Sequence, residues 1–308
     1  MYSQEVQIGT IIVSYHSDAL TIEMVQDQLS KIKNEQIIVI VNNGATFNSS
    51  KQIAKAIDGK VITDFTKSEI SPSNCYVIHN EENSGFAKGN NIGVEFLTTH
   101  FKIDYLLFTN NDIQIIDNNV VEQLVSKMQN CPQIGIIGPK VIGLDGKCQS
   151  PNNYVPFWDE ILWMTWGRFL KIKSAKTFNR DVAPSGFYYR VMGSFFMTRY
   201  EDFINCGKMD EKTFLFGEEV ILSERMKKIN KKVYYLSSTA VLHAHGQTIS
   251  KHVNLTRGAK IMYNSLLYYF KYYRNVNNVD ILLSKFVFYP YIYMQHFFRL
   301  LKRIFFNT

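Results

Sequence analysis

The segment YLLFTNND, residues 105–112, carries the most information about the fold of this chain. Residues 105–109 are almost entirely apolar, which is typical of a strand buried on both faces of a sheet. Asn110, Asn111 and Asp112 follow at the carboxyl end of that strand. Carboxylate and amide oxygens suit Mg²⁺ or Mn²⁺, whose remaining ligands are often substrate phosphates. A turn is the alternative interpretation, because Asn and Asp are also common after strands.

Two upstream segments repeat this pattern of an apolar strand followed by polar residues. Residues 7–14 and 36–41 read as buried strands, and a third strand is expected over residues 75–79. The polar clusters at the first two strand ends are Ser14-Tyr15-His16 and Asn42-Asn43-Gly44. Parallel strands of an open α/β sheet present their carboxyl ends at one edge, where ligands bind. The clusters therefore predict a single cleft there.

Between the strands, apolar residues recur every three or four positions, which predicts amphipathic helices. Helices are expected at about 17–32, with Ser17 or Asp18 as its cap, and at 87–98, 117–128 and 218–229. Further strands are expected over 191–198 and 232–236, and loop with short helix over 151–184. Strands that alternate with helices predict an α/β fold with a largely parallel sheet covered on both faces.

The composition is that of a globular protein, with 46% hydrophobic and 20% charged residues among 308. The net charge of +7 favours a polyanionic partner: nucleic acid, an anionic membrane surface or a phosphorylated substrate. Nucleic acid is the least favoured, because the basic residues are not gathered in one patch and no binding motif is present. The four cysteines lie far apart without a CxxC pair, which argues against a disulfide framework and a zinc site. Without a signal-peptide pattern or a spanning apolar stretch, we expect a cytoplasmic protein.

Three further groups of residues are candidates for chemistry. The glycine-rich loop at residues 83–93 can hold an anion or a base edge, although a capped helix start explains it equally well. Glu218 and Glu219 open a helix, where they either complement the helix dipole or provide a general base. His243 and His245 alternate at a strand end, and either a metal ligand or a structural histidine fits that position.

Six segments in this order resemble glycosyltransferase family 2, particularly its rhamnosyltransferase-like bacterial branch. They are VNNGA (41–45), NSGFAKGNNIG (83–93), LLFTNND (106–112), GSFFMTR (193–199), GKMDEKTFLFGEE (207–219) and AVLHAHG (240–246). The resemblance spans roughly residues 8–250. It implies a GT-A fold, with a mixed, mainly parallel sheet and a Rossmann-like nucleotide-binding half.

The resemblance also implies an inverting transfer of a sugar from a nucleoside diphosphate, UDP or dTDP, in bacterial surface polysaccharide synthesis. Asp112 and His243 would hold Mn²⁺ or Mg²⁺ on the diphosphate, and Glu219 would be the catalytic base, with Glu218 beside it. The residues expected to bind the donor are Ser14, Tyr15, Asn42, Asn43, Gly85, Phe86, Lys88, Asn90, Asn110 and Asn111.

The chain departs from the family pattern at three positions. Asn42 and Asn110 stand where the family usually has Asp, and Glu219 also replaces an Asp. These changes keep open a non-catalytic partner subunit that retains the fold. Nucleotidyl transfer to sugar phosphates uses a similar fold, but the glycine-rich basic loop that it needs after the first strand is missing here.

The C-terminal segment, residues 256–308, differs in composition from residues 1–255, which we expect to form the catalytic domain. It is dense in aromatic and basic residues, and Pro290 interrupts its second apolar run. This composition is typical of an interfacial helix, but a helical pair packed on the catalytic domain or on a second subunit of a homo-oligomer fits as well. The resemblance favours the membrane, with a saccharide or lipid-linked saccharide acceptor and a peripheral location on the inner face of the cell membrane.

Overall fold

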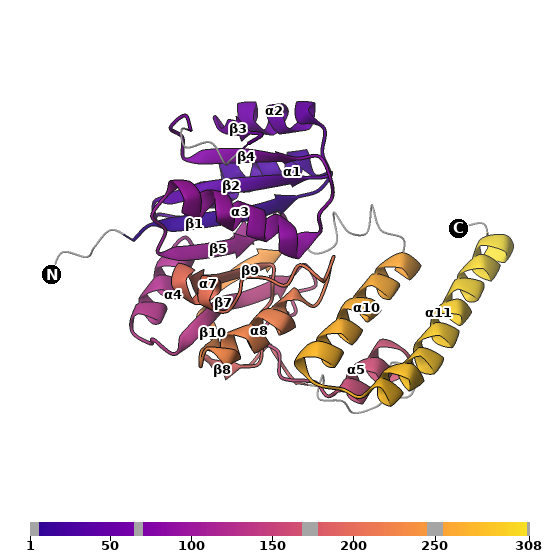
Figure 1. Ribbon diagram of the computed structural model, residues 1–308. Coiled ribbons are helices and arrows are strands. Elements are labelled where there is room, and N and C mark those ends of the chain that lie inside the picture. The colour runs from indigo at the N-terminus through magenta and orange to yellow at the C-terminus, as the bar shows by residue number, and fades with distance from the viewer. Residues whose placement is uncertain (1–5, 65–69, 168–177, 245–254, 307–308) are drawn as a thin grey trace.

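The computed structural model describes residues 6–64, 70–167, 178–244 and 255–306 (Figure 1). In these ranges, ten strands form one sheet in the order β3-β4-β2-β1-β5-β9-β7-β10-β6, with β8 paired to β10. The strands are β1 (Ile8–Ser14), β2 (Gln36–Asn43), β3 (Lys60–Ile62), β4 (Cys75–Asn80), β5 (Tyr105–Thr109), β6 (Ile113–Ile115), β7 (Ile134–Gly143), β8 (Gly186–Tyr188), β9 (Phe195–Arg199) and β10 (Lys232–His243).

The sheet is mixed and mainly parallel, as the resemblance implied. β1 pairs in parallel with β2 and β5, β4 pairs in parallel with β2 and β3, and β7 pairs in parallel with β10. β9 runs antiparallel between β5 and β7, and β6 and β8 run antiparallel to β10. The carboxyl ends of β1, β2 and β5 consequently lie at one edge of the sheet.

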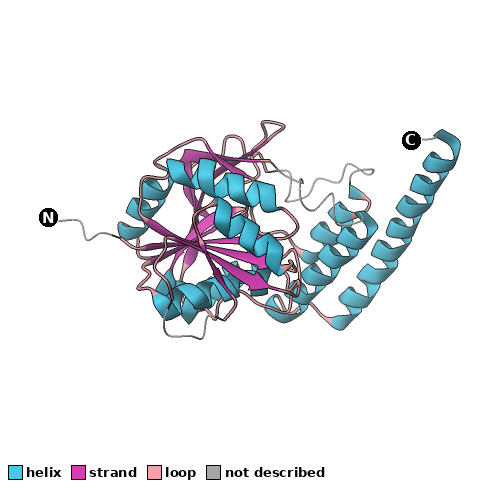
Figure 2. Cartoon of the chain, turned by 90° about the horizontal axis from the view of Figure 1, so that it is seen from above, coloured by secondary structure: helices cyan, strands magenta, loops and turns pink. Residues whose placement is uncertain are grey.

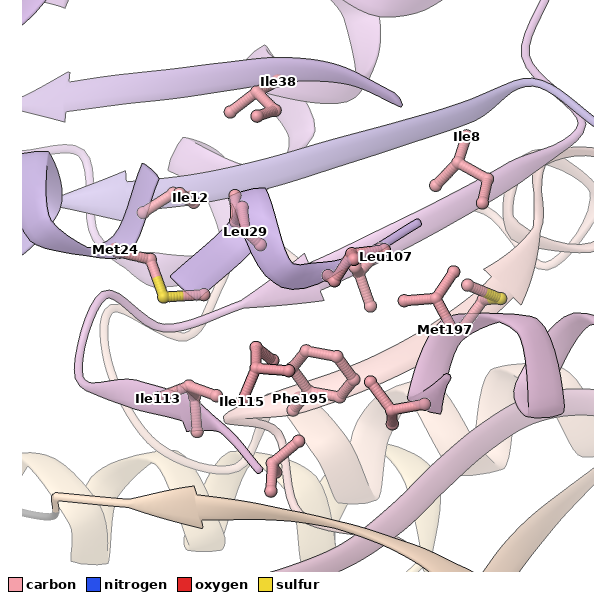
Figure 3. Packing of buried hydrophobic residues seen from close by; sticks show 14 of the residues in the cluster. Ile8, Ile12, Met24, Leu29, Ile38, Leu107, Ile113, Ile115, Phe195 and Met197 are labelled. Carbon is pink, nitrogen blue, oxygen red and sulfur yellow. The ribbon is translucent and has the colours of Figure 1, made fainter. Parts of the chain in front are cut away.

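Helices cover both faces of this sheet (Figure 2). They are α1 (Asp18–Glu23), α2 (Phe47–Ala56), α3 (Phe86–His100), α4 (Val120–Gln129), α5 (Phe157–Met164), α7 (Tyr200–Asn205), α8 (Glu218–Lys228), α10 (Leu255–Tyr273) and α11 (Asn278–Phe306). Residues of α1, α2 and α4 join the apolar core on one face, where Met24 and Leu29 pack with Ile12, Leu107 and the other residues of Figure 3. Residues of α3, α7 and α8 form the core on the other face.

Most predicted elements are present, with shifted ends. The predicted helix over 17–32 starts at Asp18 as α1 but continues as a π-helical turn (Met24–Gln28) and a 3₁₀ turn (Leu29–Lys31). In the widened turn, Gln28 Oε1 accepts a hydrogen bond from the backbone N–H of Ile115 at 2.9 Å. The strand predicted over 191–198 was wrong at its start, because β9 begins at Phe195 and the preceding residues form a turn.

The C-terminal helices α10 and α11 pack side by side and share an apolar cluster with α5 and α8. Figure 1 shows them beside the sheet, next to α5. The rings of Tyr263 and Phe288 stack with centroids 3.8 Å apart, and the Tyr263 and Ser284 hydroxyls lie 2.7 Å apart. Pro290 does not end the helix, since α11 continues through it; the position is exposed, so the carbonyl that loses its partner can be hydrated. No helix in the described ranges is long and apolar enough to span a bilayer.

Candidate active site

A cavity with an empty volume of about 1210 Å³, open to solvent, lies at the carboxyl ends of β1, β2 and β5. Part of this space is open solvent, and the cavity has the size of a ligand-binding cleft. Its wall includes Tyr15, Asn110, Asn111, Asp112 and His243, together with both glutamates at the start of α8, Glu218 and Glu219. The structure thus brings together segments that are far apart in the sequence, at the edge where the strand pattern predicted a cleft.

Asp112 and His243 face one another in this cavity. Asp112 Oδ1 lies 3.3 Å from His243 Nε2, and the two side chains are only 9% and 2% exposed. His243 Nδ1 lies 2.8 Å from Gln149 Oε1. If the amide oxygen accepts, Nδ1 carries the proton and the lone pair of Nε2 is directed toward the carboxylate.

This arrangement fits a divalent cation. Asp112 Oδ1 is buried and has no hydrogen-bond partner among the described residues. Two electron-pair donors that face each other at this distance are stabilised by a cation between them. The described residues contain no cluster of three or more His, Cys, Asp or Glu side chains that could hold a metal. Asp112 and His243 by themselves are a partial ligand set, which is usual for cations that also bind substrate phosphates.

Glu218 and Glu219 begin α8 and have different surroundings. Glu218 is 6% exposed, and its Oε1 has no hydrogen-bond partner among the described residues. Burial, and then the neighbouring carboxylate of Glu219, raise the pKa of Glu218 to about 8. Glu219 is half-buried and lies against Gly193, where an added Cβ would come within 2.5 Å of Glu219 Oε1. Gly193 therefore provides the space that the Glu219 carboxylate occupies.

The glycine-rich loop is held in place by Asn43. Its amide nitrogen donates to Asn83 Oδ1 at 3.0 Å and to the Gly85 carbonyl at 3.2 Å, and its oxygen accepts from the N–H and the hydroxyl of Ser84. Gly85 has φ = +84°, and an added Cβ would lie 2.4 Å from the Phe214 carbonyl oxygen. Only glycine fits this position, and the backbone N–H of Phe86 can then bond to the same carbonyl at 2.9 Å.

The predicted donor-binding residues fall into two groups. Tyr15, Asn43, Gly85, Phe86, Asn110 and Asn111 line the cavity, together with Asp112, Glu218, Glu219 and His243. Ser14, Asn42, Lys88 and Asn90 do not. His245 lies outside the described residues.

Buried contacts explain why three of these four side chains are not on the cavity wall. Ser14 Oγ accepts from the Thr21 hydroxyl at 2.8 Å, and the Asn90 amide donates to the Phe86 carbonyl at 2.9 Å. The Asn42 amide donates to Ser49 Oγ and Ser50 Oγ at 2.9 and 3.1 Å. Lys88, in contrast, is exposed.

Asn111 lines the cavity, but its amide nitrogen is already bonded to two hydroxyl groups of the chain. It donates to Ser17 Oγ at 2.7 Å and to Thr21 Oγ1 at 2.9 Å. This side chain consequently ties the end of β5 to the start of α1.

Several residues of the site were not singled out from the sequence. Ser194 lines the cavity, and its hydroxyl is buried without a hydrogen-bond partner among the described residues. Gly193 and Ser194 begin the segment GSFFMTR, so the order of motifs contained a signal for them. Gln149 had no such signal, because its contact with His243 joins positions 94 residues apart.

The family model for glycosyl transferase family 2 matches residues 10–204. The chain belongs to this family. Glycosyltransferase family 2 was also the family that the order of motifs resembled, and the matched range includes the ends of β1, β2 and β5 that form the cavity.

Among curated proteins, the N-acetylglucosaminyl-diphospho-decaprenol L-rhamnosyltransferase of Mycobacterium tuberculosis is 24% identical to this chain over 153 residues. That match covers 46% of this chain and 47% of the relative, so the chain spans about half the length of the curated relatives that it matches.

Solved structures share the GT-A fold at low sequence identity. The mannosyltransferase PcManGT from Pyrobaculum calidifontis, solved with GDP-Man and Mn²⁺, gives a TM-score of 0.56 at 11% identity, covering 90% of this chain and 66% of that chain. GalNAc-T7 with UDP, GalNAc and Mn²⁺ gives 0.54 at 15% identity, covering 79% of this chain and 44% of that one. S. aureus TarS 1-349 gives 0.51 at 15% identity, with coverages of 88% and 73%. The chain therefore has a GT-A fold.

Proposed function

We propose that this glycosyltransferase moves a sugar from a nucleoside diphosphate, UDP or dTDP, to a hydroxyl of a lipid-linked saccharide, with inversion at the anomeric carbon. One observation carries the proposal. Buried polar atoms of Asp112, Ser194 and Glu218, without hydrogen-bond partners among the described residues, converge on one cavity that also holds Glu219. Buried polar groups are normally satisfied, so this convergence indicates a ligand-binding site.

The proposed reaction is a single displacement. Glu219 accepts the proton of the acceptor hydroxyl while that oxygen forms a bond to the anomeric carbon of the donor. The bond from the anomeric carbon to the diphosphate oxygen breaks at the same time, and the nucleoside diphosphate leaves. Attack from the face opposite the leaving group inverts the configuration.

Asp112 and His243 are the residues that would hold a Mn²⁺ or Mg²⁺ ion. Such an ion supplies stabilisation of the charge that develops on the leaving diphosphate. Gln149 would fix the orientation of the His243 ring through Nδ1. Mn²⁺ in the structures of two GT-A relatives supports this assignment.

The lipid-linked acceptor is supported by the name of the mycobacterial relative, which includes a diphospho-decaprenol. The exposed apolar residues of α11 support a location at the inner face of the cell membrane. They recur with helical spacing and are 47–70% exposed: Val279, Leu282, Leu283, Phe286, Tyr293, Phe297 and Phe298. A role in bacterial surface polysaccharide synthesis follows from such an acceptor.

The Glu219→Gln variant tests the proposed chemistry. Because the amide cannot accept the proton, we expect loss of transfer with unchanged binding of the donor nucleotide. NMR of the product gives the anomeric configuration and checks inversion. Normal turnover of Glu219→Gln would contradict the assignment of the base. Wild-type protein that binds the nucleotide but transfers no sugar would instead favour a non-catalytic partner subunit.

A further inference from the structure

A second cavity, with an empty volume of about 530 Å³, lies between loop residues, which include Asn152, Arg180 and Arg190, and the helices α5, α8 and α10. Figure 1 shows α8 next to α10, with α5 below them. The wall of this cavity carries two arginines, Arg180 and Arg190, together with aromatic and aliphatic side chains that include Tyr269 and Phe270 of α10. We call it the arginine cavity. The proposed reaction does not involve this cavity.

Both arginines form hydrogen bonds with one residue, Asn152. Arg180 Nε and Nη2 donate to Asn152 Oδ1 at 3.0 and 2.7 Å. The backbones of Arg190 and Asn152 form an isolated antiparallel bridge, with N–O distances of 3.1 and 2.9 Å. Burial, and then the charge of Arg190, lower the pKa of Arg180, which indicates that the two guanidinium groups repel one another.

The positive charge of this pair is only partly offset within the described part of the chain, by the nearby carboxylate of Asp181. Neither guanidinium has an ion-pair partner among the described residues. Glu160 is a single carboxylate on the wall, and it has an interaction of its own. Glu224 lies close by, but Arg274 pairs with it at 2.7 Å. Two guanidinium groups with free N–H donors in one cavity are suited to a phosphate or diphosphate.

Two residues on the wall of the arginine cavity are close in sequence to the proposed catalytic base or to the glycine that contacts it. Val220, on its wall, follows Glu219 in α8, and Arg190 stands three residues before Gly193, which contacts Glu219. Three residues span at most about 10 Å of extended chain. The Arg190 and Gly193 backbones are therefore at most about 10 Å apart, which places the arginines near Glu219.

We propose that Arg180 and Arg190 bind the diphosphate of the lipid-linked acceptor, so that the adjoining sugar presents its hydroxyl to Glu219. This inference rests on the proposed function and adds the site of the acceptor to it. The donor diphosphate occupies the other cavity, at Asp112. The aromatic and aliphatic wall formed by α10 contacts the apolar part of the same acceptor.

Calorimetric titration of the full chain with inorganic pyrophosphate, in EDTA, tests this site. We expect Arg190→Gln to weaken pyrophosphate binding at least tenfold, and Asp112→Asn to leave it unchanged. Lys140→Gln is the matched control. It also removes one positive charge, but Lys140 Nζ contacts the Asp181 carbonyl at 3.4 Å and does not line the cavity. Equal affinity of wild type and Arg190→Gln, with both proteins folded by circular dichroism, overturns the proposal.

Binding of farnesyl diphosphate and binding of a nucleoside diphosphate provide two further tests. Farnesyl diphosphate should bind more tightly than pyrophosphate, because the apolar wall contributes; equal affinity contradicts a lipid-linked ligand. Nucleoside diphosphate binding, measured separately with Mn²⁺, reports on the proposed function. If the wild-type protein binds no nucleotide but still binds pyrophosphate through the arginines, the transferase function is rejected and the anion site is kept. If the protein binds nucleotide but its pyrophosphate binding does not depend on the arginines, only the anion site is rejected.

Discussion

Replacement of Gly193 by alanine tests the position of Glu219, the proposed catalytic base. An added Cβ would lie 2.5 Å from Glu219 Oε1 and 2.6 Å from its Cγ, whereas ordinary contacts begin at 3.4 Å. Gly193 is not in the left-handed region, so alanine fits the backbone and the flexible carboxylate must move. A retreat of about 1 Å misplaces the base, and errors of that size cost about 100-fold in rate. We therefore expect kcat to fall about 100-fold, with an unchanged KM for the donor.

The assay is release of nucleoside diphosphate from the nucleotide sugar, at a saturating concentration of acceptor. Gly186→Ala is the matched control, because its Cβ would meet only Tyr188 Cε2, at an ordinary 3.7 Å. This control should keep the wild-type rate. A folded Gly193→Ala protein with wild-type kcat would refute the position of Glu219 as the base.

Three other substitutions probe stability and metal binding. The folded state holds a proton on Glu218 between pH 4.5 and about 8, so the free energy of unfolding should fall with rising pH in that window, by up to about 1.4 kcal/mol per pH unit. Glu218→Gln should remove this slope in urea titrations; an unchanged slope would contradict the raised pKa. Gln149→Ala should weaken Mn²⁺ binding about 10–100-fold by calorimetry, because the His243 ring loses its partner; wild-type affinity would argue against that role. Tyr273 donates to Asp210 Oδ2 at 2.5 Å. Tyr273→Phe should therefore cost about 1.5–3 kcal/mol of unfolding free energy, and wild-type stability would count against this contact.

The strands that the sequence predicted well are those with uninterrupted apolar runs. β5 matches its predicted range, Tyr105–Thr109. β7 was missed, although it is central to the second half of the sheet, because Gly135, Gly138 and Pro139 break its apolar pattern. Pro139 pairs with Leu236 beside an irregularity in β10, where a missing N–H is tolerated. That pairing depends on a partner strand almost 100 residues away, which no local pattern shows.

The edge of the sheet that holds the site was predictable, but the direction of each side chain was not. Asn42 and Asn43 are adjacent in β2, and strand geometry directs them to opposite sides. Asn42 consequently bonds to α2, away from the cavity, while Asn43 organises the loop that contains Gly85. Residue 42 does not line the cavity, so the presence of Asn42 where the family usually has Asp leaves the cavity wall unchanged. Contacts such as that of Gly193 with Glu219 arise only from the tertiary fold.

We expect the cavity at Asp112 to bind a nucleoside diphosphate together with a divalent cation. Thermal-shift measurements on purified protein, with UDP, dTDP, GDP and their sugars, with and without Mn²⁺ or Mg²⁺, test it most directly. We expect stabilisation by one nucleotide that depends on the cation and is lost in Asp112→Ala. No stabilisation by any nucleotide, or equal stabilisation of Asp112→Ala, would contradict it.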